Sequence, residues 1–207
     1  LSEAYARARS TDPDSAFGGI IAVSTAVDKE TATAINETFN EIVIAPSFSE
    51  EAMGVLTKKK NLRLLETGTF TPKQPRRIPR GVVGGVLVMD RDLGALEVKD
   101  LKVVSETKPS QEELQGLLFA WRTVKWVKSN AIVYTNEKAT VGIGAGQMSR
   151  VDAARFAAQK ARSSLTGCYM ASDAFFPFRD CVDIAAEYGI KAVIEPGGSI
   201  RDEESIQ

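Results

Sequence analysis

A glycine-rich loop in the second half of the chain combines residue types that bind anions. The segment GIGAGQMSR holds Gly142, Gly144, Gly146, Ser149 and Arg150. The glycines permit close approach of the backbone, and the serine and arginine stand where a helix is expected to begin, which suits a phosphate or a carboxylate. The spacing is not GxGxxG and no acidic residue follows about 20 positions on, so a dinucleotide fingerprint is not indicated. A tight turn between a hairpin and a helix would explain the same glycines.

A loop rich in phenylalanine follows further along the chain. In the segment SDAFFPFRD, the rings of Phe175, Phe176 and Phe178 stand around the rigid Pro177. In one interpretation the rings fill the space between a sheet and a helix. In the other, at least one ring stacks on a flat heterocycle in a concave pocket. Asp180, which follows them, either contributes to that pocket or caps the next helix.

Polar residues at strand starts are further candidates. Lys128 and Asn130 lie between a long helix and a strand. A lysine near a helix C-terminus is typical of a solvated cap. An amide at a strand start can aim a donor and an acceptor into a site, where it would orient an amide substrate or stabilise a developing oxyanion. In the first half, Gly18 stands at a strand entrance and Glu41 just before a strand, where a carboxylate is either solvated or holds a ribose or a ring amino group.

Absent residue types exclude several classes of function. The 207 residues contain no histidine, which excludes zinc-deaminase and Ser-His-Asp chemistry within these residues, and we expect no metal site. Lys plus Arg number 26 against 27 Asp plus Glu, so neither a nucleic acid nor a membrane surface is an expected partner. The apolar runs are shorter than the ~20 residues of a membrane span. Two cysteines, Cys168 and Cys181, are expected to be buried free thiols in a reducing compartment, the cytoplasm.

The expected elements alternate between helix and strand, which is typical of α/β folds. Periodicity and capping signals predict helices over 1–10, 28–40, 49–60, 110–128, 149–162 and 180–189. Short apolar runs predict strands over 16–24, 42–46, 62–66, 82–89, 101–105, 131–134, 141–143, 168–172 and 191–195, and a loop over 72–80. The two loops described above and a third, PGGSIRD, follow strands and precede helices, where open α/β sheets place their ligands. A subdomain boundary is expected near Pro109.

Six segments in order and spacing carry a resemblance to a known family. They are DPDSAFGG, EIVIAPSFSEEA, KSNAIVY, GIGAGQMSRVDA, ASDAFFPFRD and EPGGSIRD. Together they resemble the AICAR transformylase domain of the bifunctional enzyme that is also an IMP cyclohydrolase. The resemblance implies a cytidine-deaminase-like three-layer sandwich in tandem units without zinc. Residues 1–108 would be the remainder of a truncated first unit, and residues 109–207 the second.

The resemblance also implies an activity and a set of site residues. The activity is formyl transfer from the co-substrate 10-formyltetrahydrofolate to the 5-amino group of aminoimidazole carboxamide ribonucleotide, a step in purine and IMP biosynthesis. The implied catalytic residues are Asn130 and Lys128, the nucleotide-binding residues are Gly18, Glu41, Asn130 and Phe175, and the folate-binding residues are Ser149, Arg150, Val151, Pro177, Phe178 and Asp180. The family's site is shared across a homodimer.

The sequence departs from the family's pattern in the segments that it does not contain. The family's Lys-His pair, and a closing segment with an arginine and a histidine, are not among these residues, so we expect the sequence to be a portion of a larger polypeptide. We therefore expect no useful turnover from these 207 residues alone. The alternative is a non-catalytic module for nucleotide and folate binding or for dimerisation. A dinucleotide-binding domain is a third reading, opposed by the glycine spacing.

Overall fold

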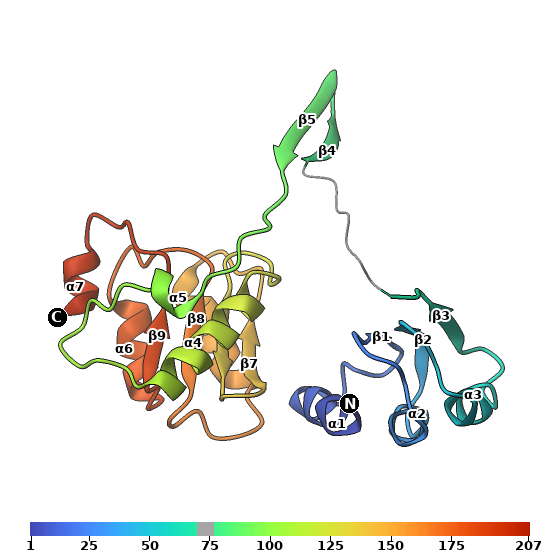
Figure 1. Ribbon diagram of the computed structural model, residues 1–207. Helices are drawn as coiled ribbons and strands as arrows, with labels where there is room; N and C mark the ends of the chain where they lie inside the picture. The colour runs from blue at the N-terminus through green and yellow to red at the C-terminus, as the bar shows by residue number, and fades with distance from the viewer. Residues whose placement is uncertain (70–76) are drawn as a thin grey trace. The chain divides into compact units, whose positions relative to one another are not determined.

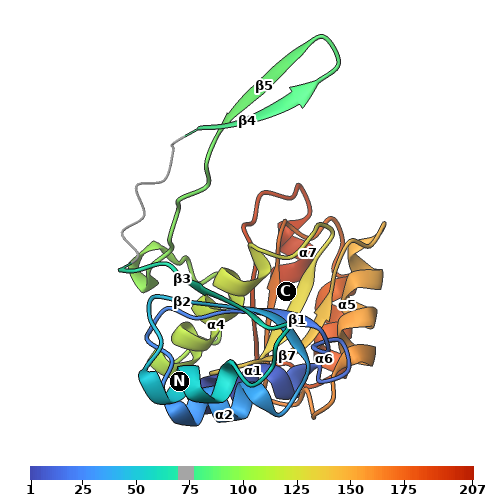
Figure 2. The ribbon, with the colours of Figure 1, turned by 90° about the vertical axis from the view of Figure 1, so that its right-hand side faces the viewer.

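The structure is a computed structural model that describes residues 1–69 and 77–207. Its contacts divide the chain into two compact units (Figures 1 and 2). Unit 1 comprises Leu1–Arg9 and Pro13–Ala95, and unit 2 comprises Ser10–Asp12 and Leu96–Gln207. Each unit combines helices with β-strands, so the predicted α/β class is confirmed. The division into deaminase-like units after residue 108 stays a prediction.

Unit 1 contains a parallel sheet in the order β1-β2-β3. Its first elements are α1 (Ser2–Thr11), β1 (Gly19–Ala22), α2 (Lys29–Asn36), β2 (Asn40–Ala45), α3 (Glu50–Leu56) and β3 (Arg63–Glu66). Helices α2 and α3 lie side by side and cover the sheet (Figure 1). Ser49 caps α3 as predicted, because its side chain accepts a hydrogen bond from the N–H of Ala52.

Unit 1 also contains an antiparallel hairpin, formed by β4 (Arg77–Val82) and β5 (Gly85–Asp90). The predicted loop over 72–80 is wrong where it overlaps β4, and its earlier part lies outside the described residues. The predicted single strand over 82–89 is also wrong, because Gly84 has a positive φ of 82° and the chain turns back there. A glycine pair inside an apolar run was therefore the signal of a hairpin.

Unit 2 is built around a mixed sheet in the order β7-β6-β8-β9. Its elements are η1 (Val98–Asp100), α4 (Gln111–Val124), β6 (Ile132–Thr135), β7 (Thr140–Gly144), α5 (Arg150–Lys160), β8 (Tyr169–Ser172), α6 (Asp180–Glu187), β9 (Ala192–Ile194) and α7 (Asp202–Ile206). Alternate residues of β6 face opposite layers, since Val133 packs with α4 and Ile132 packs with α5 and α6. Helix α4 therefore packs on one face of the sheet, and helices α5 and α6 pack on the other.

The segment predicted as a strand over 101–105 is not a strand. Val103 and Val104 are exposed, and the segment joins η1 to α4 without pairing with any strand of the described residues. β-branched residues favour an extended backbone, but a strand forms only where a neighbouring strand supplies hydrogen-bond partners. This prediction was wrong because local propensity was not matched by a partner in the sheet.

The strand directions bring the predicted ligand loops together. β6 is antiparallel to both β7 and β8, and β8 is parallel to β9. β7, β8 and β9 therefore run in the same direction. Their carboxyl ends lie at the end of the sheet where β6 begins, and this end of the sheet is called the edge below. The loops GIGAGQMSR, SDAFFPFRD and PGGSIRD follow these strand ends. This edge also receives the residues just before β6, among them Asn130.

Candidate functional site

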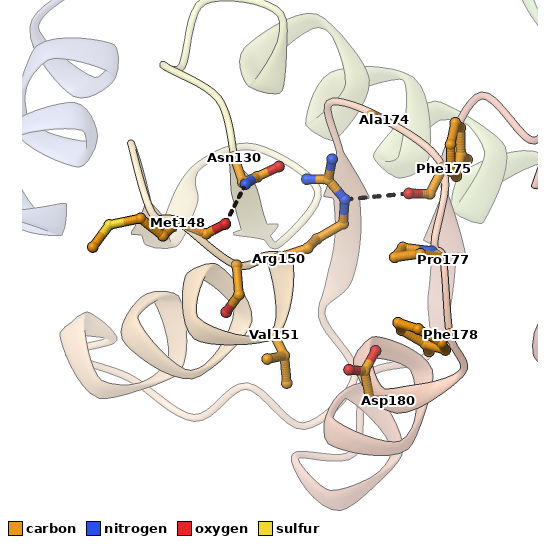
Figure 3. A pocket seen from close by; sticks show the side chains of 10 residues that line it. Asn130, Met148, Arg150, Val151, Ala174, Phe175, Pro177, Phe178 and Asp180 are labelled. Atoms are coloured by element: carbon orange, nitrogen blue, oxygen red, sulfur yellow. Dashed lines mark hydrogen bonds between the residues drawn. The ribbon is translucent and has the colours of Figure 1, made fainter.

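A pocket of about 320 Å³ opens at this edge of the unit 2 sheet (Figure 3). Its lining residues are Asn130, Met148, Ser149, Arg150, Val151, Ala174, Phe175, Pro177, Phe178 and Asp180. They come from the start of β6, the start of α5 and the loop between β8 and α6. All except Met148 and Ala174 are candidates from the sequence. Each of these two directly precedes a candidate residue, so adjacency in the chain was the available signal.

The side chain of Asn130 offers an acceptor to the pocket. Its Nδ2 donates to the backbone oxygen of Met148 at 3.1 Å (Figure 3) and to that of Gln147 at 2.9 Å. Because both partners are carbonyl oxygens, the nitrogen has to occupy this position, and Oδ1 is the remaining polar atom. An acceptor orients an N–H group, whereas an oxyanion requires a donor. Of the two roles that the sequence left open for Asn130, this geometry suits orientation of an amide or amine.

Lys128 lies close to the pocket but does not line it. Its side chain is exposed, and its backbone oxygen accepts a hydrogen bond from the N–H of Gly146 at 2.7 Å. Gly146 has a positive φ of 66°, which turns the loop after β7 back toward the end of α4. The structure thus gives the Lys128 backbone a part in holding the glycine loop. A catalytic role of the Lys128 side chain stays a prediction.

Arg150 links two walls of the pocket. Its Nη1 lies 2.9 Å from Oδ1 of Asp173, and its Nε donates to the backbone oxygen of Phe175 at 3.2 Å. The side chains of this ion pair are only 11% and 15% exposed. Screening by water is therefore weak, and the charge-assisted hydrogen bond is strong. The other N–H groups of the guanidinium remain to bind a carboxylate or a carbonyl oxygen.

The N-terminus of α5 is already capped by the chain itself. The hydroxyl of Ser149 accepts from the N–H of Asp152 at 3.1 Å and donates to the Asp152 carboxylate at 2.6 Å. The predicted helix start is confirmed. The Asp152 carboxylate, in the first turn, already interacts with the positive end of the helix dipole. It would therefore repel an anionic ligand at the N-terminus of α5. An anionic ligand would therefore meet Arg150 rather than the helix end.

Gly142 and Gly144 of the segment GIGAGQMSR lie in β7 rather than in the loop, and they have a packing role. A Cβ on Gly142 would lie 2.0 Å from the backbone oxygen of Ala157, and one on Gly144 would lie 1.9 Å from that of Ala153. Both contacts are far shorter than van der Waals separation, so only glycine lets α5 lie directly on β7. The close backbone approach that the sequence indicated is made by a helix rather than by a ligand.

The three phenylalanines of the loop SDAFFPFRD have different roles, so both interpretations from the sequence, filling of the core and exposure in a pocket, apply. Phe176 is buried, 2% exposed, in the core with α5 and α6. Phe175 and Phe178 line the pocket and are 43% and 51% exposed. The guanidinium of Arg201 lies 5.1 Å from the centre of the Phe178 ring, which brings PGGSIRD next to this loop. One ring fills the core, and the other two offer surface to a flat ligand.

Asp180 both begins α6 and lines the pocket. The N-cap of α6 is Arg179, so the alternative in which Asp180 is the cap was wrong by one position. The Asp180 carboxylate accepts a hydrogen bond from the N–H of Cys181 at 2.8 Å. Burial raises the pKa of the Cys181 thiol to about 12, and it also raises the pKa of the Cys168 thiol. The predicted burial of both free thiols is confirmed.

Glu195 is a titratable residue that the sequence analysis missed. It follows β9 and precedes the third loop. Burial raises the pKa of its carboxyl, although the Gly197 N–H, which donates to it at 2.7 Å, acts in the opposite direction. Glu195 does not line the pocket, so the direction of this shift alone gives it no part in the site. Its position directly before a Pro-Gly-Gly turn was the signal that pointed to it.

Gly18 and Glu41 form a second group of candidates, in unit 1. They lie at the amino ends of β1 and β2, which are paired at this end. Gly18 has a positive φ of 74° and donates its N–H to the backbone oxygen of Phe39 at 3.0 Å. Glu41 is the second residue of β2 rather than the residue before it, and its carboxylate lies 2.8 Å from Arg63 on the surface. Both residues are half-buried.

Residues 1–69 and 77–207 contain no cluster of three or more His, Cys, Asp or Glu side chains that could hold a metal ion. No helix in the same part of the chain is long and apolar enough to cross a membrane. The polar side chains that line the pocket are those of Asn130, Ser149, Arg150 and Asp180.

A comparison with known protein families adds an independent result. Residues 1–160 match the family model described as the AICARFT/IMPCHase bienzyme. The matched range includes the candidates of unit 1 and the Asn130 and α5 walls of the pocket. The family is one of enzymes in purine biosynthesis, and the resemblance is confirmed at the level of the family, with the first four of the six segments inside the matched range. The chain belongs to the AICARFT/IMPCHase bienzyme family.

Proposed function

We propose that this chain carries the binding site for the formyl-transfer step, in which 10-formyltetrahydrofolate formylates the 5-amino group of aminoimidazole carboxamide ribonucleotide. The observation that carries the proposal is the pocket of unit 2. It collects the implied folate residues and two of the implied nucleotide residues, although they are widely separated in sequence. Its volume of about 320 Å³ lies at the lower end of the range for small-molecule sites.

The chemistry of the lining residues supports a flat, partly anionic ligand. Phe175 and Phe178 offer apolar ring surface to a heterocycle, and Arg150 offers N–H groups to a carboxylate or a carbonyl. Oδ1 of Asn130 would accept a hydrogen bond from the substrate's carboxamide or amine and so orient it. The amine is conjugated to a carboxamide and is a poor nucleophile, so positioning and proton removal both matter. Lys128 is proposed as a catalytic residue only on the family resemblance.

The second part of the proposal concerns the nucleotide and the dimer. We propose that Gly18 and Glu41 contact the nucleotide and that two copies of the chain form a homodimer that shares its sites. The β4–β5 hairpin supports a partner, because it exposes a row of apolar side chains, Val82, Val83, Val86, Leu87, Val88 and Met89. An isolated two-stranded hairpin is at best marginally stable in water, so burial of these side chains by another chain would stabilise it.

The same family is the basis for proposing a more specific fold class and a cellular location. We propose a cytidine-deaminase-like sandwich for unit 2, supported by helices on both faces of its mixed sheet. Two buried free thiols support a reducing compartment, the cytoplasm. Polypeptides of these 207 residues are proposed to bind both ligands without turnover, because the family's Lys-His pair is not among these residues.

The test is calorimetric titration of the 207-residue chain with folic acid and, separately, with the aminoimidazole nucleotide. Both are expected to bind, and NAD, the control ligand for a dinucleotide-binding domain, is not. An assay of formyl transfer from 10-formyltetrahydrofolate and an assay of ring closure to IMP are run on the same sample. Failure to bind either ligand would contradict the proposed site. Turnover would contradict the requirement for the missing pair.

A non-catalytic binding module is the second candidate, and one observation favours it. The titratable side chains that line the pocket are only Arg150 and Asp180, so the pocket itself offers few groups for proton transfer. Such a module would bind folate and nucleotide with no turnover even when the missing Lys-His segment is supplied in a longer polypeptide. Recovery of formyl transfer in that longer polypeptide would exclude it.

A further inference from the structure

Asp173 is a charged residue that is nearly buried although it does not line the pocket. It follows β8, and its side chain is 15% exposed. Its Oδ1 accepts two hydrogen bonds, from the N–H of Ala131 at 3.0 Å and from Nη1 of Arg150 at 2.9 Å. Its own N–H donates to the backbone oxygen of Ala131 at 3.3 Å. One carboxylate therefore connects the end of β8 to the starts of β6 and α5.

The groups that Asp173 holds are neighbours of the pocket residues in the chain. Asn130 directly precedes Ala131, and Phe175 follows Asp173 by two positions. Arg150 receives the Asp173 carboxylate on one side and donates Nε to the Phe175 backbone on the other, at 3.2 Å. The ion pair thus sets the separation between the Asn130 wall and the Phe175 wall. It also determines which N–H groups of Arg150 remain for a ligand.

We propose that Asp173 is a positioning residue of the folate and nucleotide pocket. Its carboxylate holds the guanidinium of Arg150 and the start of β6, so that the Arg150 donors and the Asn130 acceptor face the pocket at a fixed separation. The inference rests on the proposed function, because it takes the folate as the ligand of Arg150. A solely structural role would instead make Asp173 a support for folding with no specific effect on affinity.

The test compares folic acid binding by the 207-residue chain and by Asp173→Asn and Asp173→Glu variants. Asparagine keeps the acceptor for the Ala131 N–H but loses the charge beside Arg150. Glutamate keeps the charge on a side chain that is one methylene group longer. We expect affinity to fall in the order wild type, Asp173→Glu, Asp173→Asn. For Asp173→Asn the loss is expected to be about 10- to 100-fold, the range seen when outer hydrogen-bond partners are removed at metal sites.

The control is Asp183→Asn, which removes a carboxylate that pairs with Arg179 at 2.8 Å on the exposed surface of α6. It is expected to leave folic acid affinity unchanged. Titrations are run below the thermal unfolding transition of each variant, so that loss of affinity is measured on folded protein.

The outcomes separate the two proposals. Wild-type affinity in folded Asp173→Asn overturns the positioning role, while binding by the wild type still supports the proposed function. Absence of binding by the wild type overturns both. If Asp173→Asn does not fold, Asp173→Glu decides, and wild-type affinity there overturns the inference. If neither variant folds, the role of Asp173 is structural and the inference is overturned.

Discussion

Units 1 and 2 each contain an arginine–carboxylate pair at a candidate binding site, and the two pairs differ chiefly in burial. Arg63 and Glu41 of unit 1 lie 2.8 Å apart, with side chains 63% and 45% exposed. Arg150 and Asp173 of unit 2 lie 2.9 Å apart, with side chains 11% and 15% exposed. Equal distances therefore do not mean equal strength. Water screens the first pair, which can separate to meet a ligand, whereas the second is part of the framework that shapes its pocket.

The largest expected effect comes from removing one partner of the buried pair. Arg150→Ala leaves the Asp173 carboxylate nearly buried without its cation, and such changes lower the free energy of unfolding by about 3–5 kcal/mol. Folic acid binding should be lost as well. Arg63→Ala, the matched change in unit 1, should cost less than about 1 kcal/mol. Denaturant unfolding of both variants checks this comparison, and equal costs would contradict it.

A second comparison uses glycines. Gly144→Ala would place a Cβ 1.9 Å from a backbone oxygen of α5, so we expect a loss of about 3 kcal/mol in unfolding free energy. Gly54 in α3 of unit 1 is the control, because a Cβ there meets nothing within 4 Å. Gly54→Ala should stabilise its helix by about 0.5–1 kcal/mol. Thermal unfolding distinguishes the two, and a neutral Gly144→Ala would show that α5 is free to shift.

A smaller effect is expected from a ring of the pocket. Phe178 is half exposed, so Phe178→Ala should change the free energy of unfolding by less than about 1 kcal/mol. It should weaken folic acid binding about 5-fold, since a stacked ring contributes on the order of 1 kcal/mol. Phe156→Ala removes an equally accessible ring of α5 that does not line the pocket. Titration of both should show a change in Phe178→Ala alone.

The smallest expected effect belongs to Glu41. Glu41→Gln removes the charge of an exposed pair, which should alter the free energy of unfolding by less than about 1 kcal/mol. Chemical denaturation provides the measurement. A loss of several kcal/mol would mean that the pair is covered in the assembled protein, and the contrast between the units would then disappear.

Local signals in the sequence were sufficient for most elements of both units. Ser49 and Ser110 cap their helices as expected, because N-capping depends only on residues a few positions apart. The segment over 101–105 was predicted wrongly, since a strand needs a partner that propensity does not reveal. The helix expected over 110–128 ends at Val124, where a tighter turn begins before β6.

The sequence was sufficient to predict which residues form the candidate site, but it was less informative about the role of each residue. Residues of the two loops line one pocket because β7 and β8 end at the same edge, a consequence of strand order that the sequence does not state. The packing role of Gly142 and Gly144 was not predictable, because it depends on how closely α5 approaches β7. Asp173 was visible only as a flank of the aromatic loop. Its burial and its two hydrogen bonds arise from the tertiary fold.

The contact between α5 and β7 has a consequence for the kinetics of ligand exchange. Since only glycine separates the helix backbone from the strand, the wall that begins at Ser149 is packed directly on the sheet and cannot move closer to it. The opposite wall, the loop after β8, is held at Asp173 and Phe175 by hydrogen bonds from Arg150, whereas the ring of Phe178 is half exposed. The rate of ligand release should therefore depend most on motion of residues 177–179, beyond these hydrogen bonds, and stiffening that part of the loop would lengthen the residence time of a bound ligand.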